Sequence, residues 1–249
     1  MALKNAGSIS YATFSPNISQ PLEVPFYNEY STFSFGTKRY RNYGITGKRT
    51  THAVSANVTS NWTLTMNGYK FGDSNVATSA IQATLTLEPY IFLPQADYNA
   101  FINLLKANGL TDSEISCMTG TRTGDWSNCN ASTTCANLTP KMPTLNFNID
   151  TTTYTVNPSS YTLQDGTNYN TTPDVIVWGC DLLVLNSVNM TNFSQNEVGL
   201  GLPFLWSHPA TFDYELETVT FDVTSLTPSE ALAAEAHSTE LMEAAMKAV

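Results

Sequence analysis

The stretch Trp62-Thr63-Leu64-Thr65-Met66-Asn67-Gly68 decides the class of fold. Apolar and polar side chains alternate along it, which places Trp62, Leu64 and Met66 on one face of a β-strand. Asn67-Gly68 is a pair that tolerates positive φ, so the sequence predicts a tight hairpin turn at this point. The alternation recurs at Leu145, Phe147 and Ile149, at Tyr154 and Val156, and at Val219, Phe221 and Val223. We therefore expect a mainly β protein built from antiparallel strands.

A short helix is predicted within this β pattern. From Asp97 to Ala107, after Pro94, the side chains of Tyr98, Phe101, Ile102 and Leu105 recur at helical spacing. Asn108-Gly109 can end the helix in the left-handed conformation. The next segment, residues 111–141, is rich in Thr, Ser, Asn and Gly and holds three of the four cysteines. We expect it to be a loop held by covalent bonds instead of a core.

The last residues predict a second helix, which begins at Thr227. Thr227 can cap it, Pro228 suits its first turn and Glu230 completes a capping box. Its apolar stripe consists of Leu241, Met242, Ala245, Met246 and Val249. This stripe can dock onto its own domain, form a seam with another chain or associate with a membrane. We therefore divide the chain into a domain over residues 1–225 and an amphipathic C-terminal helix over residues 226–249.

The composition favours a secreted protein and disfavours nucleic acid as a partner. The net charge of the 249 residues is -10, whereas a protein that binds phosphates or anionic membranes needs an excess of cations. Lys38, Arg39, Arg41, Lys48 and Arg49 form the one basic concentration, which we interpret as a solvated hairpin or as a contact for an anion, glycan or acidic partner. No apolar stretch is long enough for a transmembrane helix.

The N-terminus and the modification motifs bear on localisation. Met1 to Ser10 has no apolar core of a signal peptide, which suggests that the sequence begins inside a longer precursor. N-glycosylation motifs occur at Asn17, Asn57, Asn61, Asn130, Asn137, Asn170, Asn189 and Asn192. We expect the protein in the extracellular space or in a secretory or vacuolar lumen.

The cysteines point to disulfides and not to a metal site. Cys117, Cys129, Cys135 and Cys180 contain no CxxC motif and no spacing suited to zinc. We therefore expect two disulfides, for which four cysteines allow three pairings. We predict neither a metal nor a cofactor.

The order of several motifs resembles that of a known family. Leu200-Gly201-Leu202-Pro203-Phe204-Leu205 followed by Phe212-Asp213 resembles the "LG..FL......FD" signature near the end of pepsin-like eukaryotic aspartic proteases. Further segments match the same family in the same order, namely Leu3 to Gly7 with Phe14-Ser15, Ser34-Phe35-Gly36 through Tyr43-Gly44, Trp62-Thr63-Leu64, Met142 to Phe147, and Tyr161 to Gln164. The resemblance implies the fold of the C-terminal lobe of such a protease, with the C-terminal helix as an addition.

The same resemblance selects one pairing of the cysteines. In the family, one disulfide joins the position before the "lPtl.f" motif to a position after the "Y.l." strand, which are Cys135 and Cys180 in this sequence. The resemblance therefore implies that Cys117 pairs with Cys129.

The catalytic motif of the family is degenerate in this sequence. Pepsin-like catalysis needs two carboxylates that share one proton, and each lobe supplies one of them. Counting back from Pro94 places Leu85-Thr86-Leu87 where Asp-Thr-Gly should lie, and counting forward from Ala83 places Thr86-Leu87-Glu88 there. The sequence has no Asp-Thr-Gly or Asp-Ser-Gly at all. Glu88 is the nearest carboxylate, but its extra methylene would displace the oxygens from the place that catalysis requires.

No other catalytic motif replaces the missing aspartate. His52, His208 and His237 belong to no HExxH motif and have no cysteine nucleophile nearby in the sequence, so we expect them to be surface or packing residues. The leading hypothesis is a non-catalytic, secreted pepsin-like domain that is a structural or binding component of a larger assembly. Another chain or an N-terminal lobe would cover the face between the lobes. The alternative is part of an aspartic endopeptidase whose N-terminal lobe lies upstream or on another chain.

Overall fold

The protein is mainly β and forms two compact units. The computed structural model describes residues 2–8, 10–18, 32–36, 49–55, 61–111, 115–117, 129–131, 134–165, 179–187 and 196–222, and the structural statements below refer to these residues. The first unit consists of Met1–Asn17, Phe33–Thr51 and His208–Val249. The second consists of Ile18–Thr32 and His52–Ser207.

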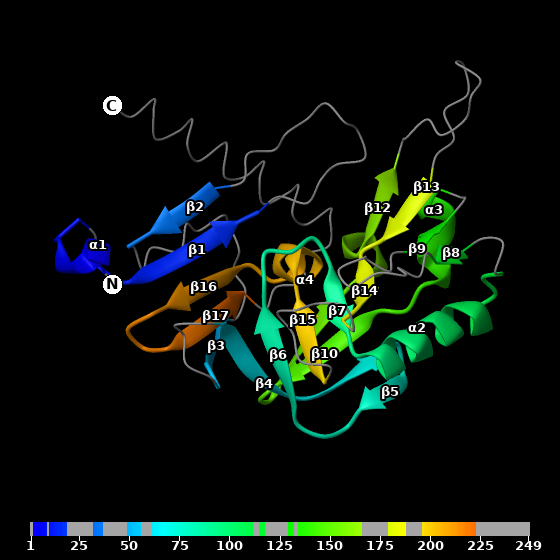
Figure 1. Ribbon diagram of the computed structural model, residues 1–249, viewed down its shortest axis with the longest axis horizontal. Coiled ribbons are helices and arrows are strands. Elements are labelled where there is room, and N and C mark those ends of the chain that lie inside the picture. The colour runs from blue at the N-terminus through cyan, green and yellow to red at the C-terminus, as the bar shows by residue number, and fades with distance from the viewer. Residues whose placement is uncertain are drawn as a thin grey trace, which may run out of the picture. The chain divides into compact units, whose positions relative to one another are not determined.

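A five-stranded sheet forms the frame of the first unit (Figure 1). Its strand order is β2-β1-β16-β17-β3. The strands are β1 (Thr13–Asn17), β2 (Thr32–Phe35), β3 (Arg49–Ala53), β16 (Ala210–Asp213) and β17 (Thr218–Asp222), and the short helix α1 (Ala2–Asn5) precedes them. Strands β16 and β17 pair antiparallel, with Thr211 opposite Thr220. The strand predicted from the alternation at Val219 and Phe221 is therefore confirmed as β17.

The two faces of this sheet differ in chemistry because side chains alternate along each strand. On one face, the ring of Phe14 stacks on that of Phe212, with 4.5 Å between the centroids. On the other face, the hydroxyl of Ser15 lies 2.7 Å from that of Thr211, and the hydroxyl of Thr51 lies 2.8 Å from that of Thr220. The first face is apolar, and the second carries rows of hydroxyl groups.

The second unit contains an eight-stranded sheet in the order β11-β10-β4-β6-β15-β7-β14, with β5 paired to β4. Its strands are β4 (Trp62–Phe71), β5 (Ser74–Ala77), β6 (Ile81–Leu85), β7 (Ile91–Leu93), β10 (Leu145–Ile149), β11 (Thr152–Val156), β14 (Val184–Asn186) and β15 (Glu197–Leu200). The predicted antiparallel pairing is found in most of it, but β15 runs parallel to β6 and β14 parallel to β7. Leu64, Met66, Phe147 and Tyr154 are fully buried, as the alternation predicts.

The predicted turn at Asn67-Gly68 is wrong. Strand β4 continues through both residues to Phe71. Asn67 is instead the extra residue of a bulge, since Gly68 pairs with Asn148 while Met66 pairs with Ile149. Gly68 has a φ of 134°, and a Cβ there would lie 2.2 Å from the carbonyl oxygen of Ala77. The glycine therefore marks a bulge at which the backbone of Ala77 approaches closely, and not a reversal of the chain.

The predicted helix is confirmed as α2 (Gln95–Ala107), which starts two residues earlier than expected. Its buried residues are Tyr98, Phe101 and Leu105, and Gly109 adopts a φ of 89° at its end. The ring of Phe101 packs edge-on against Phe71, with 5.4 Å between the centroids. Burial raises the pKa of Tyr98 to about 12. The helix therefore packs firmly on the strands.

The cysteine-rich segment has more regular structure than the sequence predicts. A four-stranded sheet has the order β12-β13-β9-β8, and α3 and two 3-10 turns accompany it. The elements are β8 (Ile115–Cys117), β9 (Cys129–Ala131), α3 (Cys135–Leu138), η1 (Thr139–Lys141), η2 (Pro158–Ser160), β12 (Thr162–Asp165) and β13 (Gly179–Leu182). The strands β8 and β9 correct the expectation of a plain loop. Strand β8 pairs with β9, and β9 pairs with β13, so both strands gain backbone hydrogen bonds that composition does not reveal.

One of the two implied disulfides is present among the described side chains. Cys135 and Cys180 are bonded, with 4.9 Å between their Cα atoms, as the resemblance implies. The backbone of Cys117 lies opposite that of Cys129 in the β8–β9 pair, and their disulfide stays a prediction.

Several expectations fall outside the described residues. The C-terminal helix, its stripe and the boundary at residue 225 all lie beyond Asp222, where the description ends. None of the described helices is long and apolar enough to cross a membrane.

Candidate functional site

The loop from Thr86 to Tyr90 connects β6 to β7 and is held by backbone hydrogen bonds. The parallel pair β6–β15 brings Leu85 opposite Leu200. Beyond this pair, the N–H of Thr86 donates to the carbonyl of Leu200 at 3.1 Å, and the N–H of Leu202 donates to the carbonyl of Glu88 at 2.8 Å. The loop is therefore fixed against the junction between β15 and the short helix α4 (Leu202–Ser207).

Gly201 lies at the centre of this junction. A Cβ at this position would lie 2.0 Å from the carbonyl oxygen of Tyr90 and 2.4 Å from that of Glu88. Both neighbours are backbone atoms, which cannot turn away as a flexible side chain can. Only glycine allows this approach, which explains why the Leu200-Gly201 pair is needed where the two segments meet.

The side chains of the loop are largely without acid–base chemistry. Leu85 is a buried residue of β6, and the loop begins at Thr86. The hydroxyl of Thr86 accepts a hydrogen bond from the N–H of Glu88 at 3.2 Å. Leu87 is 47% exposed, and the half-buried Glu88 supplies the one carboxylate of the loop.

Tyr90 closes the loop and stays protonated at ordinary pH. Burial raises the pKa of its phenol, and the negative charges of Asp181 and Glu88 raise it further. A phenol with a raised pKa is a poor general base near neutral or acidic pH. The loop therefore offers Glu88 and a neutral tyrosine, and no pair of carboxylates that could share a proton.

Other described carboxylates have structural partners. The carboxylate of Asp213 accepts the N–H groups of Glu215 and Leu216 at 2.9 and 3.1 Å, which fixes the turn between β16 and β17. Asp97 accepts the hydroxyl of Tyr69, and Glu197 accepts that of Thr84. These contacts explain the acidic side chains as parts of the fold.

The two histidines of the described chain, His52 and His208, are both buried. His208 is 4% exposed. His52 is 1% exposed and lies between two partners, with Nδ1 2.6 Å from the carboxylate of Asp150 and Nε2 2.6 Å from the hydroxyl of Tyr154. Sequence reasoning missed this network because its members lie about a hundred positions apart along the chain and form no local motif.

The remaining predicted site residues are only partly described. The side chains of Asn61 and Asn137 are exposed, as glycosylation requires. Asn17 and Asn130 are described only in their backbones, and Asn57, Asn170, Asn189 and Asn192 lie outside the described residues, as do His237 and the stripe from Leu241 to Val249. In the ranges that the structure describes, no three His, Cys, Asp or Glu side chains come together as metal ligands would.

The strand-rich architecture, with its few short helices, agrees with the fold of a pepsin-like lobe. Comparison with known families gives the same result, because residues 2–223 match the eukaryotic aspartyl proteases. The match spans most of the chain, so the protein belongs to the eukaryotic aspartyl protease family. No curated protein matches the chain.

Proposed function

We propose that this chain is a non-catalytic member of its family, a secreted pepsin-like domain that is a structural or binding component of a larger assembly. The observation that carries the proposal is the loop from Thr86 to Glu88, which is anchored by the backbone of Leu200 and Leu202 but holds no aspartate. A scaffold that lacks the carboxylate cannot activate water by sharing a proton between two acids.

The geometry supports the register that begins at Thr86. Leu85 belongs to the buried end of β6, and Thr86 is the first residue beyond the strand. The hydroxyl of Thr86 accepts the N–H two residues ahead, an interaction that an aspartate in the same place would also make. In this register Thr86, Leu87 and Glu88 replace Asp-Thr-Gly. A threonine hydroxyl does not ionise at physiological pH, so it cannot replace the acid.

Glu88 is a poor substitute for the aspartate. It lies two residues further along the loop, and its backbone is fixed by the hydrogen bond from Leu202. Its side chain is also one methylene longer, and displacements of about 1 Å are costly for catalysis. We therefore assign the carboxylate of Glu88 no role in peptide hydrolysis.

The function in an assembly follows from what the chain retains. The buried Cys135–Cys180 disulfide is typical of oxidising compartments, which supports secretion or a secretory or vacuolar lumen. The partner would be another protein chain or an N-terminal pepsin-like lobe, which would cover the apolar face that one lobe presents to the other.

An assay of peptide cleavage tests the loss of catalysis. Native material is incubated with a peptide library between about pH 2 and 7, with and without pepstatin. We expect no pepstatin-sensitive cleavage and no pepstatin binding. The matched variants are Glu88→Gln and Glu217→Gln, of which the second lies in the turn that leads to β17. Pepstatin-sensitive cleavage that Glu88→Gln removes and Glu217→Gln retains would overturn the proposal in favour of an aspartic endopeptidase.

A second measurement tests the assembly. The mass of native material in solution is determined together with its N-terminal sequence and its bound chains. We expect a mass larger than that of one chain and a stoichiometric partner. A lone chain at all concentrations would contradict the proposed assembly while leaving the loss of catalysis intact.

A further inference from the structure

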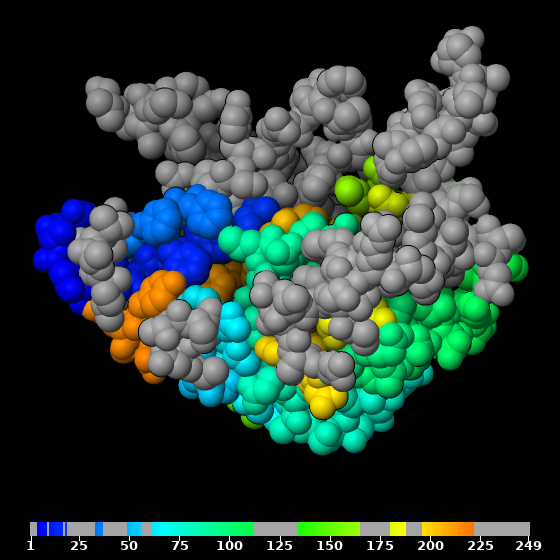
Figure 2. Space-filling view, in the orientation of Figure 1, coloured from blue at the N-terminus to red at the C-terminus, as the bar shows by residue number. Residues whose placement is uncertain are grey.

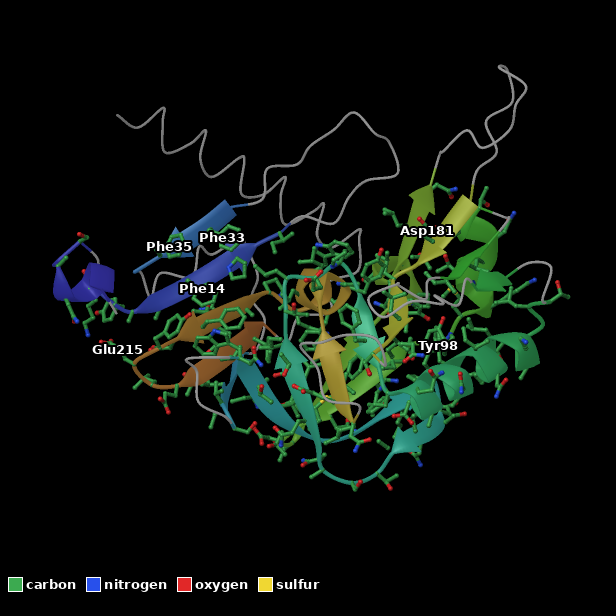
Figure 3. All side chains as sticks on the ribbon, viewed as in Figure 1. Phe14, Phe33, Phe35, Tyr98, Asp181 and Glu215 are labelled. Atoms are coloured by element: carbon green, nitrogen blue, oxygen red, sulfur yellow. A yellow bond between two sulfur atoms is a disulfide. The ribbon has the colours of Figure 1, made fainter. Side chains whose placement is uncertain are left out.

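Two phenylalanines stand exposed on the edge strand of the first unit. Phe33 is 49% exposed and Phe35 is 55% exposed, and both belong to β2. Their rings lie nearly parallel, with 6.4 Å between the centroids, because residues two apart on a strand point to the same side. Strand β2 ends the five-stranded sheet, and no described strand pairs with its outer edge. Figure 3 shows the two rings along β2.

These rings continue the apolar face of the sheet. The N–H of Gly36 donates to the carbonyl of Thr13 at 2.9 Å, and β2 runs antiparallel to β1 (Figure 1). This pairing places Phe35 beside Phe14, whose ring in turn stacks on that of Phe212. Phe212 is 3% exposed, so the apolar face is covered at the centre of the sheet and uncovered at β2. Figure 2 shows the atoms of β1 and β2 side by side at the surface, in two shades of blue.

An exposed apolar edge strand such as β2 is unfavourable unless another segment packs against it. An edge strand that carries large apolar side chains is a template for pairing with other chains, and natural proteins usually cover it. Of the five large apolar side chains that are exposed in the described chain, Phe33 and Phe35 are the two on one strand. The stacked pair is therefore the exposed apolar surface on β2 that a further segment could cover.

We propose that the C-terminal segment from Thr227 to Val249 docks onto this pair, with its apolar stripe of Leu241, Met242, Ala245, Met246 and Val249 against Phe33 and Phe35. The proposal concerns the chain beyond the described residues, and it rests on the place where β17 ends and on the sequence that follows. A methionine-containing stripe suits a pair of rings because the flexible thioether packs well against aromatic edges.

The reach of the segment agrees with this site. Strand β17 ends at Asp222, and β2 is the third strand away in the order β17-β16-β1-β2, a distance of about 14 Å at normal strand spacing. Residues 223–226 can span about 13 Å when extended. A helix from Thr227 to Val249 would then be about 35 Å long. In such a helix the stripe begins at Leu241, about 21 Å from Thr227, and the distance to β2 lies within the combined reach of residues 223–226 and the helix.

The net charge of the segment after β2 is opposite to that of the C-terminal segment. Residues 37–49, which follow β2 along the chain, contain five basic residues and no acidic ones. The segment from Thr227 to Val249 contains four glutamates and one lysine. Opposite net charges attract each other, and salt weakens the attraction. Attraction to its own chain, together with the reach, favours this occupant over a second copy, which would have to bind from solution.

The test uses two neighbouring alanines, Ala245 inside the stripe and Ala244 outside it, which a helix would separate by about 100°. In the full chain, Ala245→Glu places a charge in the stripe, whereas Ala244→Glu places the same charge outside it. Amide hydrogen exchange is measured for residues 32–36, with β4 as the reference for global folding. We expect exchange at residues 32–36 to rise about tenfold in Ala245→Glu and to stay unchanged in Ala244→Glu, while β4 is unaffected in both. Equal exchange in the two variants would overturn the proposal.

A crosslink decides between this occupant and a second copy. The variant with Phe35→Cys and Met242→Cys is oxidised at low protein concentration and analysed by mass. We expect a crosslink within one chain, and none when Leu216→Cys replaces Phe35→Cys as the exposed apolar control. A crosslink between chains, or no crosslink, would overturn the proposal. Neither result bears on the loss of catalysis, which the cleavage assay tests separately.

Discussion

The loop from Thr86 to Tyr90 and the hairpin of β10 and β11 are stabilised in opposite ways. The loop is held by backbone atoms, with the carbonyl groups of Glu88 and Tyr90 surrounding Gly201. The hairpin has its own antiparallel backbone pairing and is also anchored by side chains, because Asp150 at its turn and Tyr154 on β11 both contact His52. The difference teaches that the loop can keep its shape while its side chains change, whereas the hairpin depends in part on the side chains that contact His52. The loss of the catalytic aspartate that we propose is therefore compatible with an intact fold.

The largest expected effect is at Gly201, where the backbone contact of the loop is closest. Gly201→Ala would push a methyl group against two carbonyl oxygens, so the chain must move. We expect the free energy of unfolding to fall by about 4 kcal/mol or more, as measured by urea denaturation.

Gly109→Ala is the matched control. Gly109 has a φ of 89° but no neighbour within 4 Å of an added Cβ. The strain of its backbone alone should cost about 1 to 2 kcal/mol. Equal costs at the two glycines would show that the contact with the loop is unimportant.

The next largest loss of stability is expected when the disulfide of the second unit is removed. The Cys135–Cys180 disulfide closes a loop of 45 residues, so the double variant Cys135→Ser with Cys180→Ser should lose about 4 kcal/mol of stability. The double variant Cys117→Ser with Cys129→Ser should lose about 3 kcal/mol if the predicted bond forms there. Denaturation under oxidising conditions measures both losses. A negligible loss in the second variant would reject the Cys117–Cys129 pairing.

The hairpin gives an intermediate effect, which tests its dependence on side chains. His52→Leu removes the ring nitrogen that contacts the buried hydroxyl of Tyr154, and we expect a loss of about 1 to 3 kcal/mol. Asp150→Asn is the control, because the Asp150 side chain is 64% exposed and asparagine tolerates its φ of 51°. It should lose under about 1 kcal/mol. A larger loss in the control would mean that the carboxylate, and not the packing of His52, holds the hairpin.

The elements that the sequence predicts well are those with a local cause. Period-two burial at Leu145, Phe147 and Ile149 and helical spacing before Gly109 depend on neighbours in the chain, and both are confirmed. Asn67-Gly68 was misleading because a bulge and a hairpin turn both need residues with positive φ, and only the partner strands distinguish them.

The same distinction between local and long-range causes applies to the candidate site. The motif around Leu200-Gly201 could be recognised because the close contact requires a glycine at this position, and a required glycine is visible in the sequence. The contacts of Glu88 with Leu202, and the network around His52, join residues far apart and could not be predicted without the fold.

The smallest expected effect is at Thr86, and it tests the comparison most directly. Thr86→Val keeps the shape of the side chain but removes the hydroxyl that accepts the N–H of Glu88. Because the backbone bonds from Thr86 to Leu200 and from Leu202 to Glu88 remain, we expect a loss of only about 1 kcal/mol by urea denaturation. Thr153→Val, at an exposed hydroxyl on β11, is the control for the loss of a surface hydroxyl.

A loss above about 3 kcal/mol at Thr86 would exceed the range of one hydrogen bond. Such a loss would mean that this side chain supports the loop, and that replacing an aspartate there could not have left the fold undisturbed.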